Sequence, residues 1–154
     1  MELKAGDKAP SFSLAIDGGG NISLSGLKGQ PAVLYFYPKD DTSGCTKEAQ
    51  DFSENLKKFA RLGVNVVGIS KDSIASHDRF KTKYKLKLIL ASDTDLEAAQ
   101  AYHVWGEKTL YGRKYMGMER ATFLIDAKGV IREIWRKVRV PGHVEAVLAA
   151  AKAL

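Results

Sequence analysis

The sequence predicts an α/β fold in which a mixed central sheet carries helices on both faces. Short apolar runs rich in valine, isoleucine and aromatic residues alternate with segments of helical apolar spacing, an alternation typical of βαβ units with parallel strands. Residues 122–126 and 130–135 flank an Ala-Lys-Gly turn and predict an antiparallel pair. Parallel and antiparallel strands in one chain indicate a mixed sheet.

The N-terminal third predicts a hairpin, a buried strand and a helix. Apolar residues alternate over residues 12–16, and a glycine-rich turn at 17–21 leads to a second short apolar stretch, which predicts the hairpin. Residues 33–37 form an aromatic and aliphatic run of strand length, which Pro38 ends because proline has no N–H for a sheet. A helical face then follows, made by Ala49, Phe52, Leu56 and Phe59.

The remaining elements follow from the same patterns. Gly63 is placed to end the helix, and residues 64–69 predict a second buried strand. Ser73 can cap a helix that reaches residue 84. We expect a strand at 86–90, a short helix at 93–102, a loop packed on the surface at 104–118, and a final helix after the Pro-Gly pair at 141–142.

Composition indicates one globular domain over residues 1–154. Hydrophobic residues make up 45% of the chain and charged residues 27%, as in ordinary soluble proteins. No apolar run approaches the roughly 20 residues that span a bilayer, and residues 1–4 lack the apolar core of a signal peptide. One cysteine excludes an internal disulfide and suits a reducing compartment. We expect a cytoplasmic protein without membrane association.

The charge pattern does not indicate a nucleic-acid partner. The formal net charge is +6, but the 24 basic residues are spread along the chain among 18 acidic ones and match no nucleic-acid-binding module. The three histidines, His77, His103 and His143, share no metal-ligand spacing, and there is no second cysteine. We therefore expect no metal and no cofactor, and we expect each histidine to be structural or exposed.

Cys45 is the residue for which the sequence most clearly indicates a chemical role. It lies one helical turn before Ala49, which places it in the first turn of the predicted helix on the inward face. The free N–H groups and positive dipole end there favour a thiolate. Thr42 stands at the expected N-cap, where its side chain can reach the N–H of Cys45 or approach the sulfur. A lone cysteine is often only a small buried hydrophobe, but the strand, proline and turn before this one favour a reactive thiol.

These residues carry a resemblance. Pro38-x-x-x-Thr42-x-x-Cys45 resembles the active-site motif of peroxiredoxins, and the longer string YFYPKDDTSGCTKEA is similar to the bacterioferritin comigratory protein branch, also called peroxiredoxin Q. Further similar stretches extend over nearly the whole chain. The resemblance implies a thioredoxin-like fold with an N-terminal addition. It also implies an enzyme that reduces hydrogen peroxide and organic hydroperoxides, with a sulfenic acid formed on Cys45.

The departures from the family pattern concern the second cysteine. The family usually has proline where Ser43 stands, which is a mild change in a turn. Many members carry a resolving cysteine where this chain has Gln50, and others carry one near Ala98 or Ala99. The chain therefore resembles a single-cysteine member that needs an external thiol, from thioredoxin, glutaredoxin or glutathione. Similar proteins are often monomers, and we expect a monomer.

Two further residues are candidates for the site. Arg120 immediately precedes the strand at 122–126, which should run antiparallel to the strand at 33–37 and so bring Arg120 beside Cys45. The resemblance assigns the same role to this arginine, while the alternative is a surface arginine at a strand end. Glu48, one turn after Cys45, can orient Arg120, although an exposed helical glutamate fits equally well. The resemblance gives Thr42 a hydrogen bond to the peroxide and Pro38 a role in shielding the sulfur.

A second function class is a non-catalytic redox sensor that passes oxidation to a protein partner. Both classes need a reactive Cys45, and they differ in whether peroxide is consumed repeatedly. The set of Pro38, Thr42, Cys45 and Arg120 favours the enzyme, because a sensor needs no group that stabilises the leaving oxygen.

Overall fold

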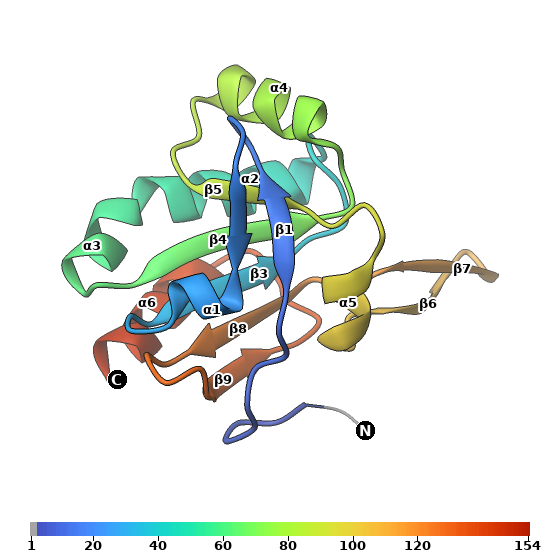
Figure 1. Cartoon of the computed structure of the whole chain (residues 1–154). Helices are drawn as coiled ribbons and strands as arrows, with labels where there is room; N and C mark the ends of the chain where they lie inside the picture. The colour runs from blue at the N-terminus through green and yellow to red at the C-terminus, as the bar shows by residue number, and fades with distance from the viewer. Residues whose placement is uncertain (1–2) are drawn as a thin grey trace.

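A seven-stranded mixed sheet forms the centre of the computed structural model, which describes residues 3–154 (Figure 1). The strand order is β2-β1-β5-β4-β3-β8-β9, with β3, β4 and β5 parallel and the other pairs antiparallel. The predicted mixed sheet and N-terminal hairpin are thus confirmed. The strands are β1 (Ser13–Ile16), β2 (Asn21–Ser23), β3 (Ala32–Phe36), β4 (Asn65–Ser70), β5 (Ile89–Ser92), β8 (Ala121–Ile125) and β9 (Ile131–Trp135).

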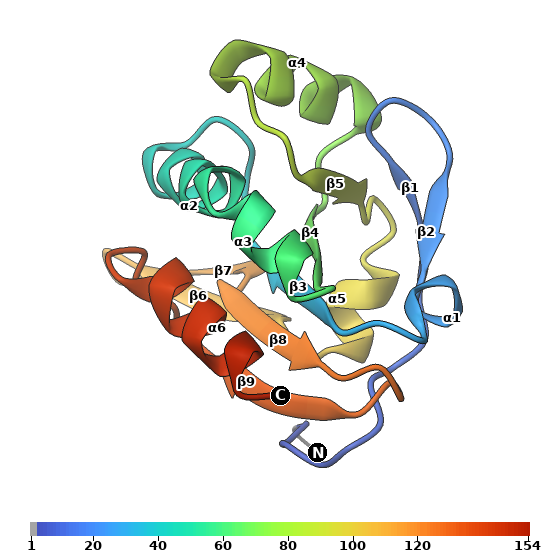
Figure 2. The ribbon, with the colours of Figure 1, turned by 90° about the vertical axis from the view of Figure 1, so that its left-hand side faces the viewer.

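Helices cover both faces of this sheet (Figure 2). One face packs against α2 (Ser43–Glu54), α3 (Leu56–Arg61), α4 (Ile74–Tyr84) and α6 (His143–Lys152), and the other against α1 (Leu24–Leu27) and α5 (Glu97–Ala101). Successive side chains of β3 alternate between the two cores, as a strand requires: Val33 and Tyr35 join the first, and Leu34 and Phe36 the second. All of β3 is buried for this reason.

The pairing of β3 with β8 decides where the site lies. The two strands are antiparallel, with Phe36 opposite Ala121, so the end of β3 lies beside the start of β8. The residue before β8, Arg120, and the helix that follows β3 therefore meet at one edge of the sheet. This arrangement confirms the strand orientation that the sequence predicts.

Residues 104–118 do not form the predicted loop. They form a β-hairpin of β6 (Trp105–Leu110) and β7 (Arg113–Met118), a two-stranded sheet separate from the central one. The turn is Tyr111-Gly112, and both residues have positive φ angles, 52° and 77°, which matches the twist of a tight hairpin. The prediction of a loop was wrong because neither face of these strands is continuously apolar, so the usual alternation is hidden.

Other boundaries differ by a few residues. The helix predicted as continuous from Cys45 to Phe59 divides at Asn55, whose side-chain amide donates to the carbonyl of Asp51 at 2.8 Å. Ser73 caps α4 as predicted, since its hydroxyl accepts from the N–H of Ser76. Within residues 3–154, no helix is long and apolar enough to cross a membrane. Met1 and Glu2, half of the segment for which no signal peptide is expected, lie outside the described residues.

Candidate active site

Cys45 is the third residue of α2 and is 1% exposed. Its neighbours on the inward face, Ala49 and Phe52, pack against β3, which holds the sulfur beside the sheet. The thiol therefore lies in the first helical turn, on the buried side, as the sequence predicts. A sulfur at this position lies close to the positive end of the helix dipole.

Arg120 bridges Cys45 and Glu48. Its Nη2 atom donates to the sulfur of Cys45 at 3.3 Å, and its Nη1 atom donates to Oε1 of Glu48 at 2.7 Å. The Arg120 side chain is 17% exposed and that of Glu48 is fully buried. The guanidinium brings a permanent positive charge to the sulfur, and its planar fork serves both partners at once. Glu48 is thus neither exposed nor free, and the alternative of a surface arginine is excluded.

The burial of Glu48 has an electrostatic consequence. Loss of water around the carboxylate raises the pKa of Glu48 to about 7, although Arg120 acts in the opposite direction. Its second oxygen, Oε2, has no hydrogen-bond partner within the described part of the chain. The negative form is therefore costly at this position and is compensated only by Arg120.

Gly44 is a site residue that sequence reasoning missed. A Cβ atom built at this position would lie 3.1 Å from Nη2 of Arg120, the same atom that donates to Cys45. A larger residue would push the guanidinium away from the sulfur. The only signal in the sequence is a glycine directly before Cys45 in the first turn of a helix, where glycine is otherwise unfavourable.

Thr42 and Pro38 lie in the segment that connects β3 to α2. Thr42 is the N-cap of α2, but its side chain makes no capping bond, and its hydroxyl donates to the carbonyl of Lys39 at 2.9 Å. The bond from the N–H of Cys45 to the Thr42 side chain, which the sequence suggests, is not formed. Pro38 is half-buried in the loop between β3 and α2.

A buried polar network fastens this loop to α4. The Asp40 carboxylate accepts from the hydroxyl of Tyr37 at 2.6 Å and from that of Ser76 at 2.8 Å, and Nδ1 of His77 lies 2.7 Å from it. His77 is fully buried, which agrees with the structural role expected of it. His143 is also buried, 2.8 Å from the hydroxyl of Thr122, and His103 is exposed.

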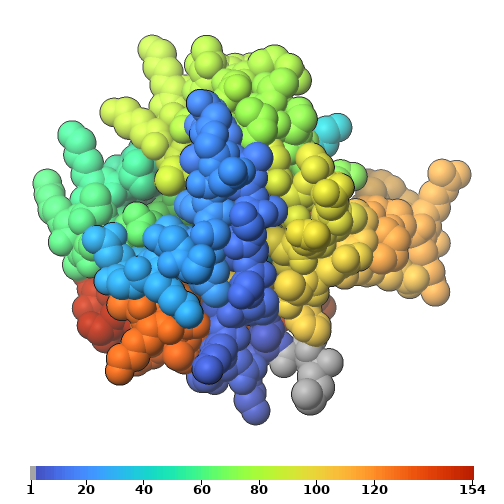
Figure 3. Space-filling view, in the orientation of Figure 1, coloured from blue at the N-terminus to red at the C-terminus, as the bar shows by residue number. Residues whose placement is uncertain are grey.

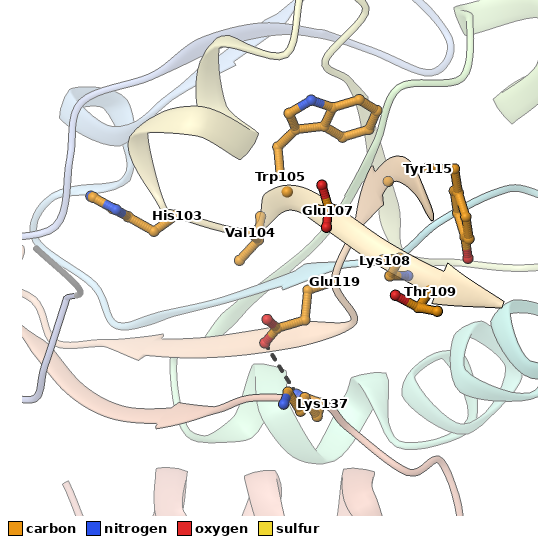
Figure 4. Close-up of a pocket in the computed structure, with 11 residues that line it drawn as sticks. His103, Val104, Trp105, Glu107, Lys108, Thr109, Tyr115, Glu119 and Lys137 are labelled. Carbon is orange, nitrogen blue, oxygen red and sulfur yellow. Dashed lines mark hydrogen bonds between the residues drawn. The ribbon is translucent and has the colours of Figure 1, made fainter. Parts of the chain in front are cut away.

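A hollow of about 400 Å³ lies along the β6–β7 hairpin (Figure 4). Trp105, Lys108 and Tyr115 line it from the hairpin, and Glu119 and Lys137 line its opposite side. In Figure 4, Glu119 and Lys137 face each other below the hairpin, joined by the bond from the N–H of Lys137 to Glu119. The hollow reaches Glu119, the residue before Arg120, but neither Arg120 nor Cys45 lines it. Among residues 3–154, no group of three or more His, Cys, Asp or Glu side chains is arranged to hold a metal.

Comparison with known proteins identifies the family. A family model described as the AhpC/TSA family matches residues 5–134. The chain belongs to the AhpC/TSA family of peroxiredoxins. It is 45% identical over 152 residues to Peroxiredoxin Bcp of Bacillus subtilis, covering 99% of this chain and 97% of that protein.

Solved structures of related proteins agree with the fold. A structure of the Xanthomonas campestris bacterioferritin comigratory protein, described in a study of its alkyl peroxide reduction activity, matches with a TM-score of 0.88 at 43% identity. The match covers 92% of this chain and 90% of that one. A Xylella fastidiosa PrxQ mutant matches with a TM-score of 0.94 at 39% identity over 99% of this chain and 98% of that one. The expected thioredoxin-like fold is confirmed, and this peroxiredoxin is a thiol-dependent peroxidase.

Proposed function

We propose that Cys45 is the peroxidatic cysteine of a single-cysteine peroxiredoxin that reduces hydrogen peroxide and organic hydroperoxides. The bridge of Arg120 between the sulfur of Cys45 and the carboxylate of Glu48 is the observation that carries this proposal. It holds a fixed positive charge beside the Cys45 sulfur at a helix N-terminus, and reactive cysteines typically lie in such electropositive surroundings. We treat residues 1–154 as one peroxiredoxin domain, and we assign it to the cytoplasm as a monomer.

In the first step, the Cys45 thiolate attacks one oxygen of the peroxide and an S–O bond forms. The O–O bond breaks, and the departing hydroxide or alkoxide takes a proton to become water or an alcohol. Arg120 stabilises the negative charge that moves from sulfur to the departing oxygen. Thr42, the N-cap residue of α2, is assigned a hydrogen bond to the peroxide. Pro38 is assigned the role of limiting the access of water to the sulfur.

In the second step, an external thiol reduces the Cys45 sulfenic acid. No second cysteine exists in the sequence, so no internal disulfide can form. An external thiolate attacks the sulfur, the S–O bond breaks, and a mixed disulfide forms while the departing hydroxide takes a proton to become water. A second thiol then releases Cys45. Thioredoxin, glutaredoxin and glutathione all have the chemistry for this step.

Hydrogen peroxide consumption with dithiothreitol tests the proposal, with wild type compared to Cys45→Ser. We expect many turnovers in the wild type and none in the variant. A single stoichiometric oxidation without turnover would contradict the catalytic role and favour the sensor. Retained turnover in Cys45→Ser would exclude Cys45 as the nucleophile.

A further inference from the structure

The tip of the β6–β7 hairpin is unusually apolar for an exposed segment. Among residues 3–154, six large hydrophobic side chains are exposed, and four of them belong to this hairpin: Leu110, Tyr111, Tyr115 and Met116. Tyr111, in the turn, is 96% exposed. In Figure 3 the hairpin projects from the body of the molecule, so these side chains do not cover another element. An apolar projection of this kind is typical of an interaction site.

The two faces of the hairpin differ in composition. Strand pairing places alternate residues on opposite faces, with Lys108 opposite Tyr115 and Leu110 opposite Arg113. We call these four residues the site face. The remaining residues of the outer half, Glu107, Thr109, Lys114 and Met116, form the reverse face. Each face therefore carries exposed apolar surface. The charged residues of the site face are all basic, whereas the reverse face has one basic and one acidic residue.

The site face leads to Cys45. The amine of Lys108 donates to the carbonyl of Met118 at 2.6 Å, two residues before Arg120. Burial and the nearby Arg120 lower the pKa of Lys108, while Glu119 and Cys45 act in the opposite direction. The side chains of Lys108 and Tyr115 both lie against Gly117, and Figure 4 shows Lys108 on the opposite side of the hairpin from Trp105. Lys108 therefore links this face to the Arg120 end of the site, with Tyr115 and Leu110 lying further along the hairpin.

We propose that the site face docks a dithiol protein reductant whose surface around its reactive thiol is apolar and acidic. The inference rests on the proposed function, in which the electrons must come from outside the chain. The reductant's first thiolate attacks the Cys45 sulfenic acid, the S–O bond breaks as the mixed disulfide forms, and the departing hydroxide takes a proton from solvent to become water. Its second thiol attacks its own first sulfur, so the Cys45 thiolate is released and the reductant leaves as an internal disulfide.

Charge argues against a second copy of the chain as the occupant. Two copies meeting through this face would bring together two patches that each contain Arg113 and Lys108 and no acidic residue. Both copies also carry a net charge of +6, so electrostatic repulsion opposes the encounter. An acidic partner experiences attraction from the same groups, and its apolar rim is matched by Leu110 and Tyr115. A small thiol is too short to contact both the sulfur of Cys45 and the outer half of the hairpin, so the hairpin would add little to its binding.

Steady-state peroxidase assays with thioredoxin as the probe test this surface. Leu110 and Met116 are exposed to 56% and 55% on opposite faces, which makes Met116→Ser a matched control for Leu110→Ser. We expect Leu110→Ser to raise the KM for thioredoxin about fivefold to tenfold, and Met116→Ser to leave it unchanged. Both variants should retain the wild-type turnover with dithiothreitol. Arg113→Glu should also raise this KM, with a smaller effect at high salt.

Equal KM values in Leu110→Ser and Met116→Ser would overturn the inference, as would turnover of the wild type with dithiothreitol but not with thioredoxin. A dimer in sedimentation that Leu110→Ser converts to a monomer would assign the face to a second copy instead. Single-turnover oxidation of Cys45 by peroxide, without any reductant, separates the two proposals. If it fails in the wild type, the proposed function is wrong. If it succeeds while the KM values stay equal, only the docking surface is wrong.

Discussion

His77 and Asp40 form a fully enclosed pair that joins helix α4 to the loop before Cys45. The Nδ1 atom of His77 lies 2.7 Å from the Asp40 carboxylate, and its Nε2 atom lies 3.0 Å from the carbonyl of Ala91. Each ring nitrogen of His77 therefore has an oxygen within hydrogen-bond distance. This contact fixes the loop between β3 and α2 to α4, a helix that begins about thirty residues further along the chain.

Removing the charge at Asp40 should destabilise the fold markedly. Asp40→Asn replaces the carboxylate that accepts from Tyr37 and Ser76 and faces His77, and breaking a buried polar network of this kind costs about 3 kcal/mol. The free energy of unfolding in urea measures this loss. Asp41→Asn is the control, because Asp41 pairs with Lys83 in an exposed position, where ion pairs contribute little. Similar losses in both variants would show that the buried pair has no special role.

Arg120→Lys should slow the oxidation of Cys45 by peroxide. Lysine has no fork that reaches Glu48 and Cys45 together, so the sulfur and the departing oxygen lose their aligned donor. We expect a rate about a hundredfold lower in stopped-flow measurements of single-turnover oxidation. Arg132→Lys, at an exposed ion pair with Asp126, is the control and should react at the wild-type rate. An unchanged rate in Arg120→Lys would exclude the proposed stabilisation by Arg120.

Glu48 should make stability depend on pH. Its pKa is raised from 4.5 to about 7 by burial, so the folded state holds the proton more tightly than the unfolded chain. The resulting stabilisation is complete below pH 4.5 and is lost as the pH rises through 7, a change on the order of 3 kcal/mol. The unfolding free energy of Glu48→Gln, relative to wild type, should therefore increase over this range.

The exposed Glu54, at the end of the same helix, provides the comparison for this titration. Glu54→Gln should follow the wild-type pH dependence of unfolding. If Glu48→Gln also follows it, the carboxyl of Glu48 is already ionised at pH 4.5 and Arg120 outweighs the effect of burial.

Excess peroxide should inactivate the enzyme at Cys45. Without a nearby thiol, the sulfenic acid can react with a second peroxide and become a sulfinic acid. Intact-mass measurement should then show two added oxygen atoms, located at Cys45 by peptide mapping, and none when thiol is present in excess over peroxide. A mass without added oxygens after treatment with excess peroxide would contradict this expectation.

The approach of Arg120 to Cys45 was predictable because it follows from strand direction. Antiparallel strands bring the start of one to the end of the other, and both strands are evident as apolar runs. The N-cap position of Thr42 was predictable, but the absence of its capping bond was not, since the orientation of the hydroxyl depends on the exact conformation of the turn. The contact between Asp40 and His77 depends on how α4 is angled over the sheet, which apolar spacing does not specify.

The hairpin was missed for a different reason. A strand reveals itself by one apolar face, and here the core does not bury either face of β6 and β7 along its length. The Tyr-Gly turn is also a weaker hairpin signal than Asn-Gly. A strand that does not pack on the core lacks the alternation of apolar and polar residues by which strands are predicted from sequence.

The buried carboxylate of Glu48 implies a conflict between thermal stability and peroxidase activity. One of its oxygens has no hydrogen-bond partner in the described structure, and its charge is balanced only by Arg120. Well-packed hydrophobic residues in place of such a pair often make a protein more heat-resistant. Selection for thermal tolerance alone would therefore favour the loss of both groups, and the variants recovered would be robust proteins unable to reduce peroxide.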